Sequence, residues 1–412
     1  MRTSLRIVLV TTLALTGCSA LLDVKDLYFD PNAGVTGGPD GSTDGPTTNE
    51  TGTANDGGTE SSTCFADLLT DSKNCGRCGH DCVGGACNAG KCEAVELGTI
   101  ADAPLQDMVV TDQFVFVSTY VTLSTQNGGV YRSAKTPGTP ELYAKLTDVA
   151  AMAVLGDLLY FVVDDNPADG TPGQFGGLYS CPIAGAAPCT PSLIAAATNS
   201  QAITVDQNKV FYGDNGPGRG IMMYTPITVP PVVVRNGFGI ASNLFVDGTS
   251  VFYTVTVQPS SPPQRAEVFE AFTDGGVDEK YVYASDNAND GRLVGFPTTM
   301  FFTAFDYQTT TTGIVRRIPR NGGAPCDYGG KDNKRPYGIH VDGTRIYWTN
   351  LGDGADRPFL NGSVVSCDQA TCCTTPDVLW AGNGQPTAIG GDATAVYFGN
   401  NANGALWKIA KP

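Results

Sequence analysis

A short phrase recurs seven times along this sequence. Each copy has a polar or acidic turn, then an apolar and usually β-branched residue, then a pair of residues that are mostly aromatic. The first residue of each pair falls at positions 116, 160, 211, 252, 301, 347 and 397, so successive copies lie 41 to 51 residues apart. A period in this range, built from strand-forming segments, is typical of a β-propeller with one four-stranded blade per repeat. The sequence therefore predicts an all-β fold, a seven-bladed β-propeller.

Four copies of the phrase begin with an aspartate, and these residues are Asp206, Asp247, Asp342 and Asp392. Asp and Gly at such turns tolerate the positive φ angles that tight hairpins need. The aromatic pair that follows suits a half-buried strand. Because these aspartates recur with the blade, we assign them a structural rather than a catalytic role.

The last repeat ends at Pro412, soon after its third strand, and lacks a fourth strand of its own. Residues 94–100 precede the first repeat and have the composition of a strand. We expect this segment to supply the missing strand and to close the ring. The alternative, an unclosed last blade, would expose a sheet edge.

The sixth repeat contains the sequence Tyr347-Trp348-Thr349-Asn350. This is similar to the YWTD propellers of lipoprotein-receptor ectodomains, with Asn in place of the final Asp. The resemblance covers residues 94–412 as architecture and is specific in this one repeat. It implies a YWTD-like or DUF5050-like propeller and says nothing of the ligand.

The N-terminus has the features of a secretion signal. Arg2 and Arg6 accompany an apolar stretch at 7–15 that is too short to span a bilayer. The sequence Leu15-Thr16-Gly17-Cys18 then resembles the lipobox of bacterial lipoproteins. This resemblance implies that residues 1–17 are removed, that Cys18 carries lipid, and, since Ser19 follows, that the destination is the outer membrane. The alternative is an ordinary cleaved signal with a spare cysteine.

Residues 18–63 are predicted to be a lipidated, disordered linker. Positions 31–63 hold almost only Gly, Thr, Ser, Asp, Asn, Pro, Glu and Ala, which cannot bury a core. As a flexible coil they would span about 30 Å. They would hold the folded part off the lipid surface.

The chain is acidic, with 41 acidic and 25 basic residues and a formal charge of −16. Removal of Arg2 and Arg6 with the signal brings the mature chain to −18. No basic patch is present to neutralise phosphates, so nucleic acid is not an expected partner.

Thirteen cysteines are present, and twelve remain for pairing if Cys18 is lipidated. Six of them fall within residues 64–93: Cys64, Cys75, Cys78, Cys82, Cys87 and Cys92. Their spacing resembles the Stig1-like Cys-rich module of plant stigma-specific proteins and myxobacterial lipoproteins. So short a segment cannot build a core, so three disulfides are expected to stabilise it. The alternatives are a zinc site from Cys75, Cys78, His80 and Cys82, and thioredoxin-like chemistry; export and the even count favour disulfides.

The other six cysteines lie in the propeller. Cys181 and Cys189 flank one outer hairpin and are predicted to pair. Cys367 is expected to pair with one of the adjacent residues Cys372 and Cys373, and Cys326 with the other.

Catalytic constellations are scarce in this sequence. His340 lies in an inner strand where the other repeats have mostly apolar or small residues, so we expect a packed, hydrogen-bonded histidine. The loops 165–170 and 286–291 begin like EF-hands, but each lacks an oxygen ligand at the third position and a closing Glu. They are interpreted as turns, with calcium binding as the alternative, and no cofactor is expected.

These features favour a surface-displayed outer-membrane lipoprotein. The membrane would be contacted through the lipid, and the propeller would act as a non-catalytic scaffold for a protein or glycan. One alternative is a propeller enzyme of the lactonase or lyase type with a metal in the central channel. A third hypothesis is a mere envelope spacer.

Overall fold

The computed structural model describes residues 67–412 with gaps at 102–103, 120–127, 147, 165–175, 217–219, 227, 237–240, 258–264, 275–279, 287–288, 297, 306–311, 321–322, 331–332 and 354–360. The described residues all belong to one compact unit, 63–412. Cys18, Cys64 and the linker at 18–63 lie outside the described residues. No described segment forms a helix with the length and apolar character of a membrane span.

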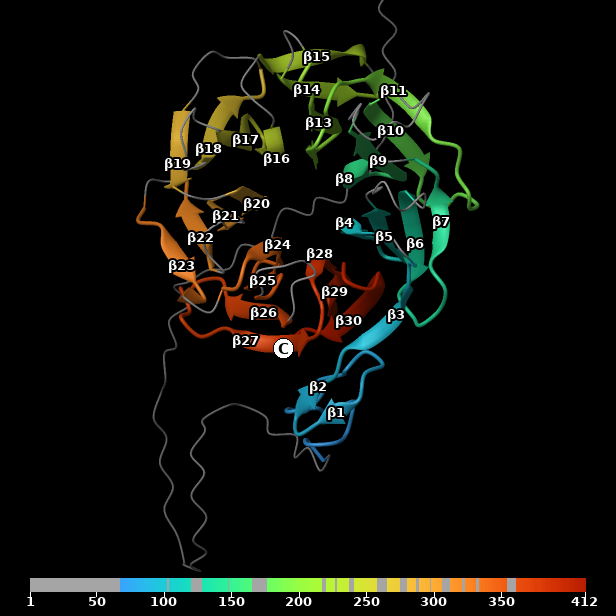
Figure 1. The fold of residues 1–412 in the computed structure, drawn as a ribbon, viewed down its shortest axis with the longest axis vertical. Helices are drawn as coiled ribbons and strands as arrows, with labels where there is room; N and C mark the ends of the chain where they lie inside the picture. Colours follow the sequence, from blue (N-terminus) through green and yellow to red (C-terminus); the bar gives the residue numbers. More distant parts are fainter. Residues whose placement is uncertain are drawn as a thin grey trace, which may run out of the picture. The chain divides into compact units, whose positions relative to one another are not determined.

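Seven antiparallel four-stranded sheets form a ring of blades around a central axis (Figure 1). Blades 1 to 6 each use four consecutive strands, ordered from the axis outward. The strands of blades 1 to 3 are β4 (Leu105–Val110), β5 (Phe114–Thr119), β6 (Gly129–Ala134), β7 (Glu141–Ala144); β8 (Val149–Leu155), β9 (Leu158–Val163), β10 (Gly177–Pro182), β11 (Ser192–Ala196); and β12 (Ile203–Asp206), β13 (Lys209–Gly213), β14 (Gly220–Thr225), β15 (Thr228–Asn236).

The strands of blades 4 to 6 follow the same order. They are β16 (Ala241–Asp247), β17 (Ser250–Val257), β18 (Arg265–Phe272), β19 (Lys280–Asp286); β20 (Asn289–Phe296), β21 (Thr299–Phe305), β22 (Gly313–Pro319), β23 (Cys326–Tyr328); and β24 (Pro336–Val341), β25 (Arg345–Asn350), β26 (Gly362–Asp368), β27 (Asp377–Gly382).

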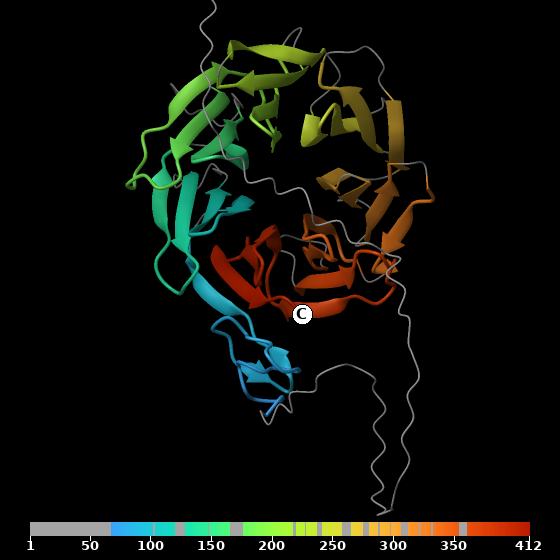
Figure 2. The ribbon, with the colours of Figure 1, turned by 180° about the vertical axis from the view of Figure 1, so that it is seen from behind.

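Blade 7 combines the two ends of the propeller segment. Its inner three strands are β28 (Pro386–Gly391), β29 (Ala395–Asn400) and β30 (Ala405–Ala410), and its outer strand is β3 (Val95–Thr99). β3 pairs antiparallel with β30, from Val95 opposite Lys408 to Thr99 opposite Ala405. The two strands lie side by side in Figures 1 and 2. The ring closure predicted from residues 94–100 is confirmed.

The recurring pair of residues on each second strand explains how the blades adhere. Neighbours on a strand point to opposite faces of the sheet, so each pair serves two blade interfaces. Each of seven hydrophobic clusters contains the first residue of one blade's pair and the second residue of the next blade's pair. These partners are Phe116 with Phe161, Tyr160 with Tyr212, Phe211 with Tyr253, Phe252 with Phe302, Phe301 with Trp348, Tyr347 with Phe398, and Tyr397 with Val117.

The Cys-rich segment before the ring contains a short hairpin of β1 (Cys87–Asn88) and β2 (Lys91–Cys92). Three buried cysteines form its small core. His80 joins this segment to the end of the ring. Its Nε2 lies 2.8 Å from the Lys411 carbonyl oxygen and its Nδ1 lies 2.6 Å from the Cys75 carbonyl oxygen. Carbonyls only accept hydrogen bonds, so both contacts are satisfied together when the ring donates from both nitrogens.

Candidate functional site

A cavity of about 440 Å³ lies on the axis of the ring. The first strands of all seven blades supply its walls, because each blade has its innermost strand at the channel. The walls are mostly aliphatic or small, with six larger polar or charged positions at Asp107, Thr204, Asn243, Arg292, His340 and Thr387. These polar groups define what the channel can do chemically.

Arg292 bridges non-neighbouring blades across the channel. From β20 its Nη2 donates to the carbonyl oxygen of Gln106 on β4 at 2.8 Å and lies 3.5 Å from Asp107 Oδ1. Asp107 Oδ2 in turn accepts the backbone N–H of Met152 on β8 at 2.8 Å. The guanidinium also lies 5.8 Å from the ring centroid of Tyr337. Blades 1, 2 and 5 are therefore connected through one ion pair.

Two other polar side chains of the channel bond across blade boundaries. Asn243 Nδ2 donates to the Gly291 carbonyl oxygen at 3.0 Å and to Thr254 Oγ1 at 3.1 Å. Thr387 Oγ1 donates to the carbonyl oxygen of Leu105 at 2.8 Å. The polar groups of this wall thus hold neighbouring blades together.

His340 packs against a glycine of the next blade. A Cβ on Gly391 would lie 2.5 Å from His340 Nε2, and a Cβ on Gly295 would lie 2.1 Å from the ring of Phe245. Phe245 occupies the position in blade 4 that His340 occupies in blade 6, so the histidine takes an aromatic packing role. The prediction of a packed histidine is confirmed. Its Nε2 is buried and has no hydrogen-bond partner among the described residues, so the expected bond is not made there.

Burial lowers the pKa of His340 to about 4, and the Lys411 ammonium adds to this effect. The carboxylates of Asp342 and Asp392 oppose it. The imidazole is therefore uncharged at neutral pH.

A divalent cation does not fit the described wall of the channel. Asp107 is the only carboxylate among the described residues that line the cavity, and the Arg292 guanidinium lies beside it. A metal there would need several oxygen or imidazole ligands and would be repelled by the guanidinium. No metal-assisted step is derived for this site.

Three of the four turn aspartates, Asp247, Asp342 and Asp392, form ion pairs between blades. Oδ1 of Asp342 accepts the backbone N–H groups of Thr344 at 3.1 Å and Arg345 at 2.9 Å. Its Oδ2 accepts the Tyr347 hydroxyl at 3.0 Å and lies 2.9 Å from Lys411 Nζ in blade 7. Burial alone would raise the pKa of Asp342, but the Lys411 ammonium and the turn amides hold it below its usual range. Burial and the adjacent carboxylate raise the pKa of Tyr347.

The whole clamp formed by these contacts recurs at one other blade boundary, and its ion pair recurs at a third. Asp392 binds its own turn amides, the Tyr397 hydroxyl at 2.8 Å, and Lys135 Nζ of blade 1 at 2.7 Å. Asp247 pairs with Arg320 of blade 5, whose guanidinium lies 4.6 Å from the Phe252 ring centroid. In each case the cation is the first residue after the third strand of the next blade. The aspartates were identified from the sequence, but their cationic partners were not. The position that the cations share, directly after a third strand, is the sequence signal that could have identified them.

The signature residues differ in their partners. Trp348 is fully buried and its Nε1 donates to Asn333 Oδ1 at 3.1 Å. After the third strand of blade 4, at the place that would clamp Asp206, the sequence has Thr273 instead of a cation.

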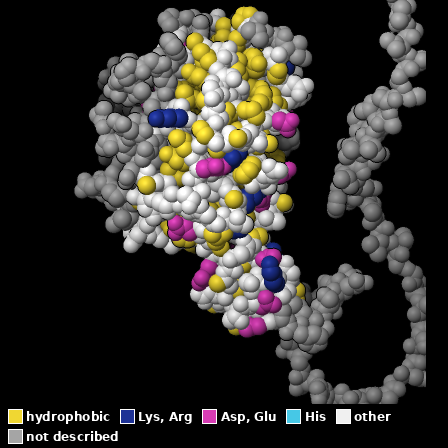
Figure 3. All heavy atoms as spheres, turned by 90° about the vertical axis from the view of Figure 1, so that its right-hand side faces the viewer, with side chains coloured by type: hydrophobic (Ala, Val, Ile, Leu, Met, Phe, Trp, Pro, Cys, Tyr) yellow, Lys and Arg dark blue, Asp and Glu magenta, His cyan; other side chains and the backbone are white. Residues whose placement is uncertain are grey.

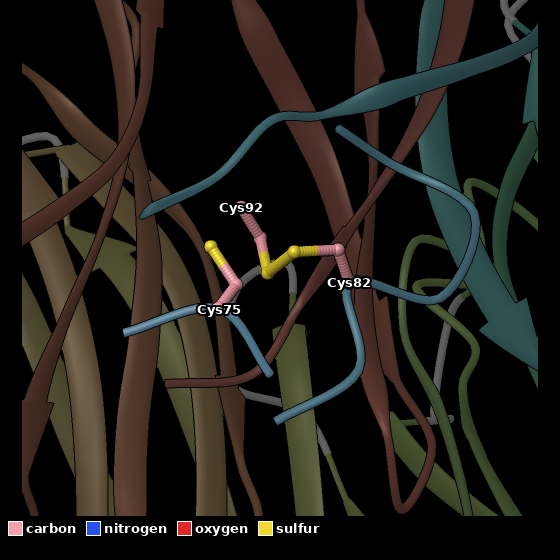
Figure 4. Close-up of side chains that lie close together, drawn as sticks. All are labelled: Cys75, Cys82 and Cys92. Atoms are coloured by element: carbon pink, nitrogen blue, oxygen red, sulfur yellow. A yellow bond between two sulfur atoms is a disulfide. The ribbon is translucent and has the colours of Figure 1, made fainter. Parts of the chain in front are cut away.

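The described cysteines are disulfide-bonded. In the Cys-rich segment Cys75 pairs with Cys87 and Cys82 with Cys92, and Cys78 is also bonded. Three of these sulfurs lie within 4.8 Å of one another, and Figure 4 shows the bond between Cys82 and Cys92 with Cys75 beside it. Sulfurs held in disulfides cannot serve as zinc thiolates, so the zinc alternative does not fit.

The propeller disulfides resolve the choice that the spacing left open. Cys181 pairs with Cys189 as predicted. Cys367 pairs with Cys373, and Cys326 pairs with Cys372. The candidate calcium loop at 165–170 lies outside the described residues, as do the side chains at 286–290.

These features define a seven-bladed β-propeller whose channel wall is held by bonds between its own polar groups. No family model matches the sequence, and no curated protein sequence matches it significantly. Among solved structures, the fold is similar to virginiamycin B lyase from Staphylococcus aureus. A catalytically inactive histidine-to-alanine variant of that lyase with quinupristin gives a TM-score of 0.53 at 13% identity, covering 78% of this chain and 99% of that chain. A selenomethionine-substituted form gives 0.51 at the same identity and coverage.

Proposed function

We propose that this chain is an outer-membrane lipoprotein whose propeller is a non-catalytic scaffold for a protein or glycan. Cys18 would anchor it, the linker at 18–63 would space it from the membrane, and the Cys-rich segment would stiffen the junction. The binding surface would be the face of the ring that carries the long loops.

The difference between the two faces carries this proposal. On one face, turns of two or three residues join the first and second strands of every blade, and connections of at most nine residues join the third and fourth strands. On the opposite face, the second and third strands are joined by longer connections, such as 120–128, 164–176 and 351–361. Long loops positioned by a rigid scaffold are the usual location of binding residues. Four of the polar side chains of the channel, Asp107, Asn243, Arg292 and Thr387, are in contrast used in bonds between blades.

The test uses the full chain with Cys18→Ser, purified without detergent. Binding to individual envelope proteins and to a panel of envelope polysaccharides would be measured by biolayer interferometry. Replacing 351–361 by a short Gly-containing turn should weaken binding of the ligand at least tenfold. The control changes the opposite face, with Asp157→Asn in a tight turn, and should bind normally. Equal binding by both variants would contradict the assignment of the face.

The anchor is tested separately. The wild-type chain should sediment with the outer membrane, and the Cys18→Ser chain should appear in the soluble fraction. Membrane-bound Cys18→Ser protein at wild-type levels would contradict lipidation at this residue.

A second candidate function is a lyase, favoured by the similarity to virginiamycin B lyase and by the unpaired Nε2 of His340 in the channel wall. The purified chain would be incubated with quinupristin, and any conversion of quinupristin would be followed by mass spectrometry. The scaffold proposal expects no turnover. Turnover that is lost in His340→Gln would replace that proposal with a catalytic one.

A further inference from the structure

The outer strand of blade 2 differs from the other six outer strands. An outer strand has one unpaired edge, and natural proteins protect such edges with charged residues or proline. The outer strands of the other blades all contain such residues in their sequences: Glu141 in β7, Pro230 and Pro231 in β15, Lys280 in β19, Asp327 in β23, Asp377 in β27, and Glu96 in β3. β11 has the sequence Ser-Leu-Ile-Ala-Ala and carries neither kind of residue.

The surroundings of β11 are also uncharged. No Asp, Glu, Lys, Arg or His occurs from position 170 to position 205, although the chain as a whole carries a charge of −16. Leu193 on β11 is 48% exposed. Figure 3 shows this side of the ring, where hydrophobic side chains gather over the upper part of the face with few charged ones among them. The edge of blade 2 is thus an apolar surface on an acidic protein.

Blade 1 holds the hairpin that leads to β11 in place. The disulfide between Cys181 and Cys189 closes its loop, and the Cys189 backbone N–H donates to the Tyr143 carbonyl oxygen at 2.6 Å. Arg132 Nη1 donates to the Gly185 carbonyl oxygen at 2.8 Å. A surface fixed in this way loses little conformational entropy when a partner covers it.

We propose that β11 is the edge through which two copies of this chain associate around a two-fold axis. In such an interface each residue meets residues of the same patch. If two copies met at any other outer edge, a charged residue or a proline would face the same residue of the second copy. At β11 no charged residue is present to face its equivalent. A two-fold axis near Ile194 places Leu193 opposite Ala195 of the second copy.

Apolar side-chain contacts would contribute more to the proposed interface than backbone hydrogen bonds. The register of β10 and β11 shifts between Leu178 and Tyr179, which leaves Ile194 without an opposite residue on β10. A bulge of this kind interrupts the outer ladder, so side chains around Leu193 would contribute most of the association. The strongly negative charge of both copies repels them, and added salt should therefore strengthen the dimer.

The test is sedimentation velocity on the full chain with Cys18→Ser, at loading concentrations from about 5 to 500 µM, the range for a weak dimer. The weight-average sedimentation coefficient should rise with concentration, and more steeply in 0.5 M than in 0.05 M salt. Leu193→Lys should remain monomeric. The matched control is Val378→Lys, which changes an equally apolar, 55% exposed residue on β27 and should associate like the parent.

The thermal midpoints of the two variants serve to exclude misfolding, since both residues are exposed. A parent chain that stays monomeric at every concentration and salt would overturn the proposal. Association of Leu193→Lys equal to that of the parent would overturn it as well. Loss of association in Val378→Lys alone would place the interface on blade 6 and reject β11.

Discussion

Truncating Leu97 to alanine tests the ring closure most directly. Leu97 lies on β3, is fully buried, and belongs to a cluster with Leu105 of blade 1 and Leu406 of blade 7. It therefore packs at the place where the two ends of the propeller segment meet. Removing a buried leucine side chain costs about 2–5 kcal/mol, because the lost contacts leave a cavity. We expect Leu97→Ala to lower the free energy of unfolding by about 3 kcal/mol.

The expected shift of the melting temperature follows from the size of the ring. Unfolding entropy is about 2.1 cal/mol/K per residue, so residues 94–412 give about 0.7 kcal/mol/K. A loss of about 3 kcal/mol then lowers the midpoint by about 4–5 °C in calorimetry. Glu96→Ala is the matched control, since Glu96 is exposed on the same strand, and it should change the midpoint by less than about 1 °C.

The reasoning is refuted if Leu97→Ala melts at the wild-type temperature, or if Glu96→Ala is destabilised equally. A second comparison does not depend on a single side chain. A chain that begins at residue 102 lacks β3, and should aggregate or melt far below a chain that begins at residue 93. Both lack the Cys-rich segment, so that segment cannot account for the difference.

Three further predictions concern the other elements. The pKa of His340 is about 4 in the folded protein, against an ordinary value near 6.5. The burial of the neutral imidazole is therefore fully tolerated above pH 6.5, and the free energy of unfolding decreases by about 3 kcal/mol as the pH falls from 6.5 toward 4. His340→Phe, which copies Phe245, should lose less stability between pH 7 and pH 4.5 than the parent in urea titrations; parallel curves would contradict this. Asp392→Asn should destabilise the boundary of blades 7 and 1 by about 1–3 kcal/mol at pH 7. Because the pKa of Asp392 is held low, the difference in stability between the variant and the parent should shrink as the pH falls below the ordinary carboxyl range. A difference that does not change with pH would argue against the clamp. Mass spectrometry of unreduced peptides should show residues 64–92 without free thiols, and stoichiometric zinc in the purified protein would refute the disulfide assignment.

The fold was predictable because each repeat carries the two large residues that pack against the neighbouring blades. A turn followed by two large residues specifies a strand with one side chain for each face, which is the unit that the clusters between blades use. The closing strand was predictable because the seventh repeat is short by one strand. Disulfide partners were predictable where the spacing was local, as for Cys181 and Cys189.

The channel was not predictable from the sequence. Arg292 reaches Gln106, which is 186 positions away and belongs to a blade that is not adjacent. Such a contact depends on the curvature of the whole ring and has no local pattern. The choice between Cys372 and Cys373 could not be predicted either. The sequence distances of these adjacent cysteines from any partner differ by only one residue, so spacing does not distinguish them.

The sharing of aromatic residues between neighbouring blades has a consequence for how the chain can be cut. Every core belongs to two blades, so no blade has a core of its own and the ring has no first or last member in energetic terms. The junction of β3 with β30 is only where the covalent chain happens to be interrupted. Joining those ends and opening the chain in another outer loop would leave all seven cores intact. The packing of the blades therefore does not fix where the ring is interrupted, and the Cys-rich segment contacts the ring at this seam through His80 and the Lys411 carbonyl oxygen.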